Sequence, residues 1–176
     1  VYRPADYFET IYCYKKSLTT KTTPSAFILS RQSLPTLENR DFSNIQKGAY
    51  ILKRENEKSG IDLILMSTGS EVSLCIEASN KLQDMGVNVR VVSIPCWELF
   101  DEQSDEYKES IFPKKIQNRI SVEAGTTIGW SKFVGDKGIS IGINDFGESA
   151  PGNVIMEKKG FSVENICNTY KKILER

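Results

Sequence analysis

Few side chains in this sequence could carry out acid–base, nucleophilic or metal chemistry. The 176 residues include 23 Asp+Glu and 23 Lys+Arg but no histidine, so the chain alone cannot form a Ser–His–Asp or Cys–His catalytic set. The four cysteines, Cys13, Cys75, Cys96 and Cys167, contain no C-x-x-C pair, which argues against zinc and redox-dithiol sites. Each lies among apolar neighbours, and we expect reduced, buried thiols.

Carboxylates follow two of the predicted strands. Glu123 comes directly after the predicted strand 118–122, and Asp145 and Glu148 come shortly after the predicted strand 139–143. Because the carboxyl ends of parallel strands meet at one edge of a sheet, these side chains could form a general acid–base pair there. Carboxylates in solvated loops are the simpler interpretation, and the sequence favours it.

Arg31 directly follows the apolar run 25–30. Ligands of open α/β sheets gather beyond the ends of the strands, where a guanidinium can hold a phosphate through two parallel hydrogen bonds. The local sequence by itself favours an ordinary surface arginine.

Two further segments could bind nucleotides or bases. Residues 67–71, Ser-Thr-Gly-Ser-Glu, lie where a strand meets a helix, and backbone N–H groups there could hold a phosphate. One glycine falls short of G-x-G-x-x-G, so a capping box formed by Thr68 and Glu71 is favoured. Trp130 and Phe133 could stack on a nucleic-acid base, but the net charge of zero favours a core or interface role.

The first part of the chain predicts a helix, a buried strand and a linker. Asp6 and Glu9 form a capping box for a helix over 6–18, whose apolar face consists of Phe8, Ile11, Tyr12 and Leu18. The apolar run 25–30 predicts a strand buried on both faces of a parallel sheet. Residues 32–47 lack an apolar period and predict a linker with at most one short helical turn, the best domain boundary in the chain.

The remainder alternates between strands and helices. Strands are predicted at 48–53, 61–67, 87–94, 118–122 and 139–143. Helices are predicted at 68–86, at 105–112 and at 163–174, and the inward face of the first comprises Val72, Cys75, Ile76, Ser79 and Leu82. The predicted fold class is α/β, with an open, mostly parallel sheet and helices on both faces.

Two features of the sequence concern membrane spans and the start of the chain. No apolar run approaches the ~18–20 residues that span a membrane. The start, Val1 to Asp6, contains neither a signal peptide nor an initiator methionine, and we expect it to lie inside a longer chain.

A series of short motifs runs through the whole chain in a fixed order. It comprises Arg3-Pro4-Ala5-Asp6, Leu29-Ser30-Arg31-Gln32-Ser33-Leu34-Pro35, Lys47-Gly48-Ala49-Tyr50, Ser67-Thr68-Gly69-Ser70-Glu71-Val72, Val91-Val92-Ser93-Ile94-Pro95, Ser121-Val122-Glu123-Ala124-Gly125, Gly129-Trp130, Phe146-Gly147-Glu148-Ser149-Ala150-Pro151 and Gly160-Phe161-Ser162. No single motif is specific. The ordered series resembles the C-terminal part of the transketolase family over essentially all 176 residues.

This resemblance implies a domain organisation and a reaction. Residues 1–38 would be the end of the pyrimidine-binding domain, 39–47 a linker, and 48–176 the Rossmann-like, three-layer C-terminal domain. Transketolases are cytoplasmic homodimers of the pentose phosphate pathway that use thiamine diphosphate and Mg²⁺ (or Ca²⁺). They transfer a two-carbon ketol unit from a ketose phosphate to an aldose phosphate.

The resemblance assigns one site residue. Arg31, in Ser30-Arg31-Gln32, matches the arginine that binds the phosphate of the sugar substrate in the family. The family's catalytic residues, cofactor ligands and metal ligands lie upstream, so none is assigned here. The fragment alone is therefore expected to bind no cofactor and to be inactive, with its C-terminal domain serving packing and dimer contacts.

Alternatives to a transketolase remain open. Dihydroxyacetone synthase, a related thiamine-dependent enzyme, fits these residues too, whereas Ser30-Arg31-Gln32 followed by Leu34-Pro35 disfavours the synthase of deoxyxylulose phosphate. A non-catalytic binding or oligomerisation module is a different class, and a start inside a predicted domain argues against it. Neither a nucleic-acid nor a membrane partner is expected.

Overall fold

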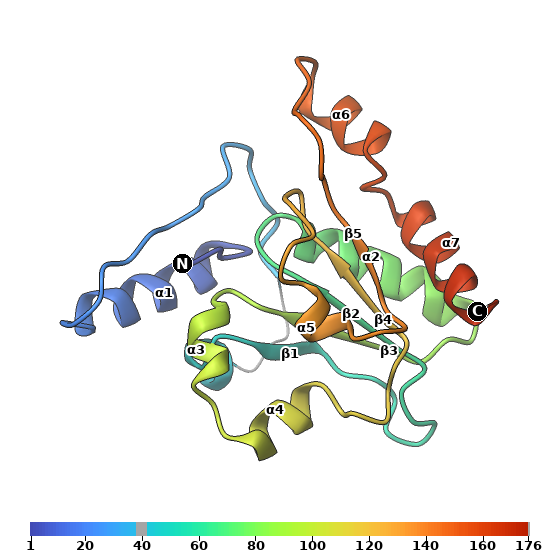
Figure 1. The fold of residues 1–176 in the computed structure, drawn as a ribbon, viewed down its shortest axis with the longest axis horizontal. Coiled ribbons are helices and arrows are strands. Elements are labelled where there is room, and N and C mark those ends of the chain that lie inside the picture. Colours follow the sequence, from blue (N-terminus) through green and yellow to red (C-terminus); the bar gives the residue numbers. More distant parts are fainter. Residues whose placement is uncertain (38–41, 176) are drawn as a thin grey trace.

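The computed structural model describes residues 1–37 and 42–175. Its elements are α1 (Tyr7–Thr19), η1 (Phe42–Lys47), β1 (Tyr50–Lys53), β2 (Leu63–Ser67), α2 (Glu71–Asp84), β3 (Val89–Ser93), α3 (Trp97–Asp101), α4 (Asp105–Ile111), β4 (Arg119–Val122), α5 (Ser131–Val134), β5 (Ile139–Ile141), α6 (Gly152–Lys158) and α7 (Val163–Leu174). Figure 1 shows α1 and the extended segment after it to one side of the sheet.

The five strands form one sheet in the order β1-β3-β2-β4-β5. Strand β1 pairs antiparallel with β3, and the other neighbours are parallel. In the central strand, Leu65 lies opposite Val91 of β3 and Ile120 of β4. Every residue of β2 and β3 is buried, as expected for parallel strands covered on both faces. The predicted α/β class is confirmed.

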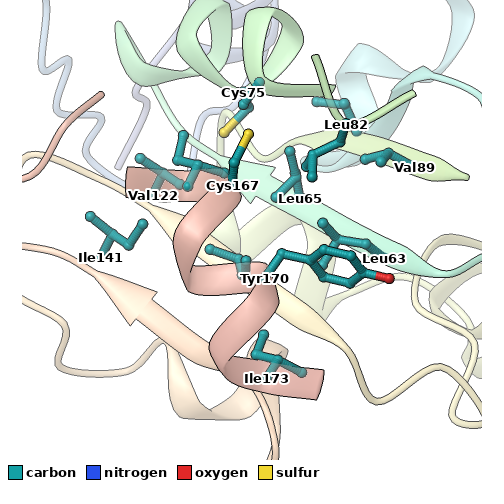
Figure 2. Packing of buried hydrophobic residues seen from close by; sticks show 14 of the residues in the cluster. Leu63, Leu65, Cys75, Leu82, Val89, Val122, Ile141, Cys167, Tyr170 and Ile173 are labelled. Carbon is teal, nitrogen blue, oxygen red and sulfur yellow. The ribbon is translucent and has the colours of Figure 1, made fainter. Parts of the chain in front are cut away.

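Each face of the sheet has its own core, because successive strand residues point to opposite sides. Leu63 and Leu65 face helices α2 and α7, and Figure 2 shows them beneath Cys75, Cys167 and other side chains of these helices. Ile64 and Met66 face the other side, which is covered by aromatic residues in or next to α3, α4 and α5: Phe100, Phe112, Trp130 and Phe133. The two cores fix the carboxyl ends of the strands, where the candidate residues lie.

The sequence-based elements after residue 47 correspond to β1 to β5, α2, α4 and α7. Helix α2 ends as predicted, since the N–H groups of Gly86 and Val87 donate to the carbonyls of Gln83 and Leu82. Helices α3, α5 and α6 were not predicted, because each is too short to show a clear helical period; α4 is as short, but Pro113 marks its end. The short turn expected in the linker is η1, while 38–41 lie outside the described residues.

Helix α1 begins as predicted but does not bury the predicted face. Asp6 caps it by accepting a hydrogen bond from the Glu9 N–H at 3.0 Å, whereas the Glu9 carboxylate accepts from Ala5 instead of completing the capping box. Of the predicted apolar face, Ile11 is 55% exposed and Leu18 is 81% exposed. The residues of α1 that are buried are Glu9 and Cys13.

The predicted strand at 25–30 is wrong. This segment forms a single parallel bridge, between Tyr2 and Phe27, and Ile28 and Leu29 are half exposed. A strand buried on both faces needs neighbours on both sides, and in the described part of the chain only Tyr2 pairs with it.

All four cysteines are free and buried, as the sequence predicted. Cys75 and Cys167 point toward each other between α2 and α7 in Figure 2. Burial raises the pKa of each thiol, so the reactive thiolate is suppressed.

We therefore expect the native chain to react with a thiol reagent at pH 8 at least about tenfold more slowly than the same chain in guanidinium chloride. Timed alkylation followed by mass spectrometry measures this ratio. A cysteine that is modified equally fast in both states would contradict the burial described here.

Candidate functional site

A small crevice lies at the carboxyl ends of β2, β3 and β4. The chain leaves β2 for α2 on one face of the sheet and leaves β4 for α5 on the other, so neighbouring connections diverge here. In open α/β sheets, ligands bind at such a point. The crevice is lined by Val1, Arg3, Thr68, Ile94, Pro95, Cys96, Trp97, Glu98, Glu123, Thr126 and Ile128.

The crevice measures about 210 Å³. Most small-molecule pockets measure about 300–1,000 Å³, so it is small even for one metabolite. A larger hollow of about 800 Å³ lies between α3, α4 and α5, lined largely by charged residues. That hollow reaches Arg119 at the amino end of β4, and Lys132 and Asp101 on its wall already pair at 2.8 Å.

Glu123 is the most constrained residue in the crevice. Its Oε1 accepts a hydrogen bond from the Thr68 hydroxyl at 3.0 Å and forms an ion pair with Arg3, and its Oε2 accepts from the Trp130 indole N–H at 2.7 Å. The side chain is buried, whereas that of Arg3 is 41% exposed. A carboxylate whose two oxygens are both engaged holds its neighbours in place and is poorly suited to act as a general base.

The capping box predicted at Thr68 and Glu71 is wrong. Helix α2 begins at Glu71, after a left-handed Gly69, and the Thr68 hydroxyl is taken by Glu123. Glu71 instead accepts hydrogen bonds from the Ala124 N–H at 3.0 Å and from the Ser70 hydroxyl at 2.6 Å. The Glu71 carboxylate therefore lies at the start of the helix. A phosphate bound there would be attracted by the positive end of the helix dipole, and this negative side chain already lies next to it.

The other predicted carboxylates lie apart from this arrangement. Asp145 pairs with Lys159 at 2.9 Å, and Glu148 pairs with Lys158 and Lys159. Hydrogen bonds from these lysines lower the pKa of the exposed Glu148. The interpretation as solvated loop carboxylates thus holds for Asp145 and Glu148 and fails for Glu123, so no acid–base pair is formed.

The aromatic pair belongs to the core. Trp130 is 1% exposed, and its ring meets that of Trp97 edge to face at 5.0 Å. Phe133 is buried in the same cluster. The predicted core role of Trp130 and Phe133 is confirmed, and neither ring is free to stack on a base.

Arg31 is exposed on the segment that returns from α1 toward the sheet. It forms no hydrogen bond or ion pair with residues 1–37 or 42–175. A guanidinium without an internal partner is free to bind an anion from outside.

Two residues that hold the N-terminal segment were not singled out from the sequence. Arg3 lines the crevice, and Glu9 is fully buried against the sheet. In the sequence, the capping pattern accounted for the presence of Glu9. The neighbouring residues do not show whether its carboxylate is buried or exposed. The motif Arg3-Pro4-Ala5-Asp6 was the available signal for Arg3.

The sheet order and the diverging connections at β2 and β4 define a doubly wound α/β domain. The family model for the transketolase-like TK C-terminal domain matches residues 48–162, and the chain belongs to this family.

Known transketolases align with nearly the whole chain. Transketolase-1, chloroplastic, of Arabidopsis thaliana is 46% identical over 171 residues, which are 97% of this chain and 23% of the relative. The transketolase structure from Leishmania mexicana matches with a TM-score of 0.91 at 34% identity, over 99% of this chain and 25% of that one. A Pichia stipitis transketolase in complex with sedoheptulose-7-phosphate matches with a TM-score of 0.89 at 36% identity, over 98% and 25%. The chain thus spans about a quarter of the length of these relatives.

The thiamine diphosphate and divalent metal that the family implies do not fit the residues present. No three His, Cys, Asp or Glu side chains gather as metal ligands in the described ranges. Glu123 is fully engaged, and Glu71 adds negative charge where a diphosphate would otherwise approach the start of α2.

None of the helices within the described ranges is both long and apolar enough to cross a membrane.

Proposed function

We propose that this chain is the C-terminal part of a transketolase, an enzyme that transfers a two-carbon ketol unit from a ketose phosphate to an aldose phosphate. The observation that carries the proposal is the alignment: nearly all of this chain corresponds to about a quarter of each relative. The sugar-phosphate substrate is supported by the Pichia stipitis enzyme, whose structure holds sedoheptulose-7-phosphate. The pentose phosphate pathway, a cytoplasmic location and a homodimer belong to the same proposal.

The proposed division of the chain is 1–38 as the end of the pyrimidine-binding domain, 39–47 as linker and 48–176 as the C-terminal domain. The exposed apolar residues of the first segment support it. Tyr7, Ile11, Tyr14, Leu18, Ile28 and Leu29 are all 45–81% exposed. Clustered exposure of large apolar side chains marks a surface that another part of a protein covers. In this proposal the rest of the pyrimidine-binding domain covers them.

Arg31 is the proposed substrate contact. Its exposure and lack of an internal partner fit an arginine that reaches toward a phosphate bound outside this segment. Binding the remote phosphate supplies energy that orients the reacting carbonyl group. The remaining role of the chain, from residue 48 onward, is packing and dimer contact.

We expect the isolated chain to bind no thiamine diphosphate, because the proposal places the cofactor's ligands elsewhere in the enzyme. Isothermal calorimetry of the 176-residue chain with thiamine diphosphate and Mg²⁺ should show no heat above dilution. The full-length Leishmania mexicana transketolase is the positive control. Micromolar binding by this chain would contradict the proposed location of the cofactor site.

A further inference from the structure

Glu9 is a fully buried carboxylate that joins three parts of the chain. Its Oε2 accepts a hydrogen bond from the Ala5 N–H at 2.6 Å. Its Oε1 accepts from the Tyr50 hydroxyl of β1 at 2.8 Å and from the Ser93 hydroxyl at the end of β3 at 2.6 Å. No Lys or Arg of the described ranges pairs with Glu9, so neutral donors alone compensate the burial of this carboxyl group.

The same face of α1 makes further contacts with the rest of the chain. Cys13, one turn after Glu9, packs with Tyr2 and Cys96, and Tyr12 packs against the cluster that contains Tyr50. The opposite face is exposed. Helix α1 therefore packs on the rest of the chain, η1 included, through small apolar contacts, and the buried carboxylate of Glu9 lies on this same face.

The position of α1 in turn determines where the segment with Arg31 lies. Tyr14 of α1 stacks on Phe27 with ring centroids 4.2 Å apart, and Phe27 also stacks on Tyr2. On the other side of Arg31, the Leu37 N–H donates to the Asp6 carboxylate at 3.1 Å. Arg31 thus lies between two points that are both tied to α1 and its cap.

We propose that Glu9 is a positioning residue, which fixes α1 on the sheet through Tyr50 and Ser93 and thereby places Arg31 for its phosphate contact. The second half of this statement rests on the proposed function of Arg31. The first half does not depend on it.

The first experiment measures amide hydrogen exchange in the 176-residue chain. In Glu9→Leu, which removes the acceptor that the three donors share, protection of the α1 amides should fall at least about tenfold while α7 is unchanged. Ser93→Ala removes one donor and should lower the protection of α1 about threefold. In the double variant, Ser93→Ala should lower the protection of α1 by less than it does alone, because Glu9→Leu has already removed the acceptor of the Ser93 hydroxyl.

The matched control is Lys15→Ala, an exposed position on the same helix, which should leave the protection of α1 unchanged. If Glu9→Leu unfolds the whole chain, Ser93→Ala alone still provides the test. Protection of α1 equal to that of the wild type in Ser93→Ala and Glu9→Leu would overturn the proposal.

The second experiment uses the intact enzyme with a ketose phosphate and with the same ketose lacking the phosphate. Glu9→Gln, which keeps the shape and one acceptor oxygen, should raise KM for the phosphorylated ketose about threefold and leave kcat within about twofold. KM for the unphosphorylated ketose should stay unchanged. If Arg31→Ala raises KM but Glu9→Gln and Glu9→Leu do not, the positioning role is wrong and the proposed function stands. If Arg31→Ala also has no effect, the phosphate contact itself is wrong.

Discussion

Replacing Arg31 by alanine in the intact enzyme is expected to raise KM for phosphorylated sugars by about tenfold or more, with a smaller change in kcat. A bidentate guanidinium–phosphate contact is among the strongest hydrogen-bonded pairs that proteins make. Arg31 has no partner among the described residues, so its removal costs the fold little and the effect falls on binding. Steady-state kinetics over a range of ketose phosphate concentrations measures it.

The control for this variant is Arg54→Ala. Arg54 is also an exposed arginine, and it directly follows β1 in the sequence. It should leave KM unchanged. Inorganic phosphate should also inhibit the wild type more strongly than Arg31→Ala, since it competes for the same guanidinium. A KM for Arg31→Ala equal to that of the wild type would remove Arg31 from the site.

Replacing Glu123 by alanine is expected to destabilise the chain by about 3 kcal/mol, because it removes the acceptor of three donors at once. The Thr68 hydroxyl and the Trp130 indole N–H are buried and lose their shared partner. The contribution of Arg3 is smaller, since its side chain is 41% exposed and water can replace the carboxylate. Urea denaturation followed by tryptophan fluorescence measures the free energy of unfolding.

Two companion variants separate the burial of Glu123 from its charge. Glu148→Ala removes an exposed carboxylate paired with lysines, and we expect its urea midpoint to match that of the wild type. Glu123→Gln keeps the shape and one acceptor oxygen and should fall between the wild type and Glu123→Ala. If Glu123→Ala is as stable as Glu148→Ala, the network in the crevice does not hold the fold together.

Strands β2 and β3 were predictable because their burial is complete. Leu63 to Ser67 and Val89 to Ser93 are buried at every position, which requires nearly continuous apolar sequence whatever the strand order. The order itself, with β2 between β3 and β4, depends on how α2 and α5 pack on opposite faces. That packing leaves no local trace in the sequence.

The wrong predictions concern segments in which long-range contacts override the preference of the local sequence. Residues 25–30 have the composition of a buried strand, yet their pairing within the described chain is limited to one bridge with Tyr2. Thr68 and Glu71 have the spacing of a capping box, but Glu123 and Ala124, more than fifty residues later, compete for the same side chains. Hydrogen bonds between residues so far apart in the sequence depend on the tertiary fold, so a local motif cannot reveal them.

The site was predictable only in its outline. The sequence placed Glu123 after one strand and segment 67–71 after another, and the structure brings Thr68 and Glu123 into direct contact. It could not show that Glu123 is buried against Arg3 and Trp130, because burial of a loop carboxylate depends on residues distant in the sequence. Burial of the four thiols was simpler to predict, since their largely apolar sequence neighbours indicate it directly.

The most direct test of the central claim is a domain exchange. This chain would replace the corresponding C-terminal quarter of the Leishmania mexicana transketolase, and the purified hybrid would be assayed for two-carbon transfer from a ketose phosphate to an aldose phosphate. We predict transfer with kcat within about tenfold of the parent enzyme, together with an increased KM when the hybrid carries Arg31→Ala. A hybrid that folds, binds thiamine diphosphate and yet transfers no ketol unit would contradict the claim that this chain is the C-terminal part of a transketolase.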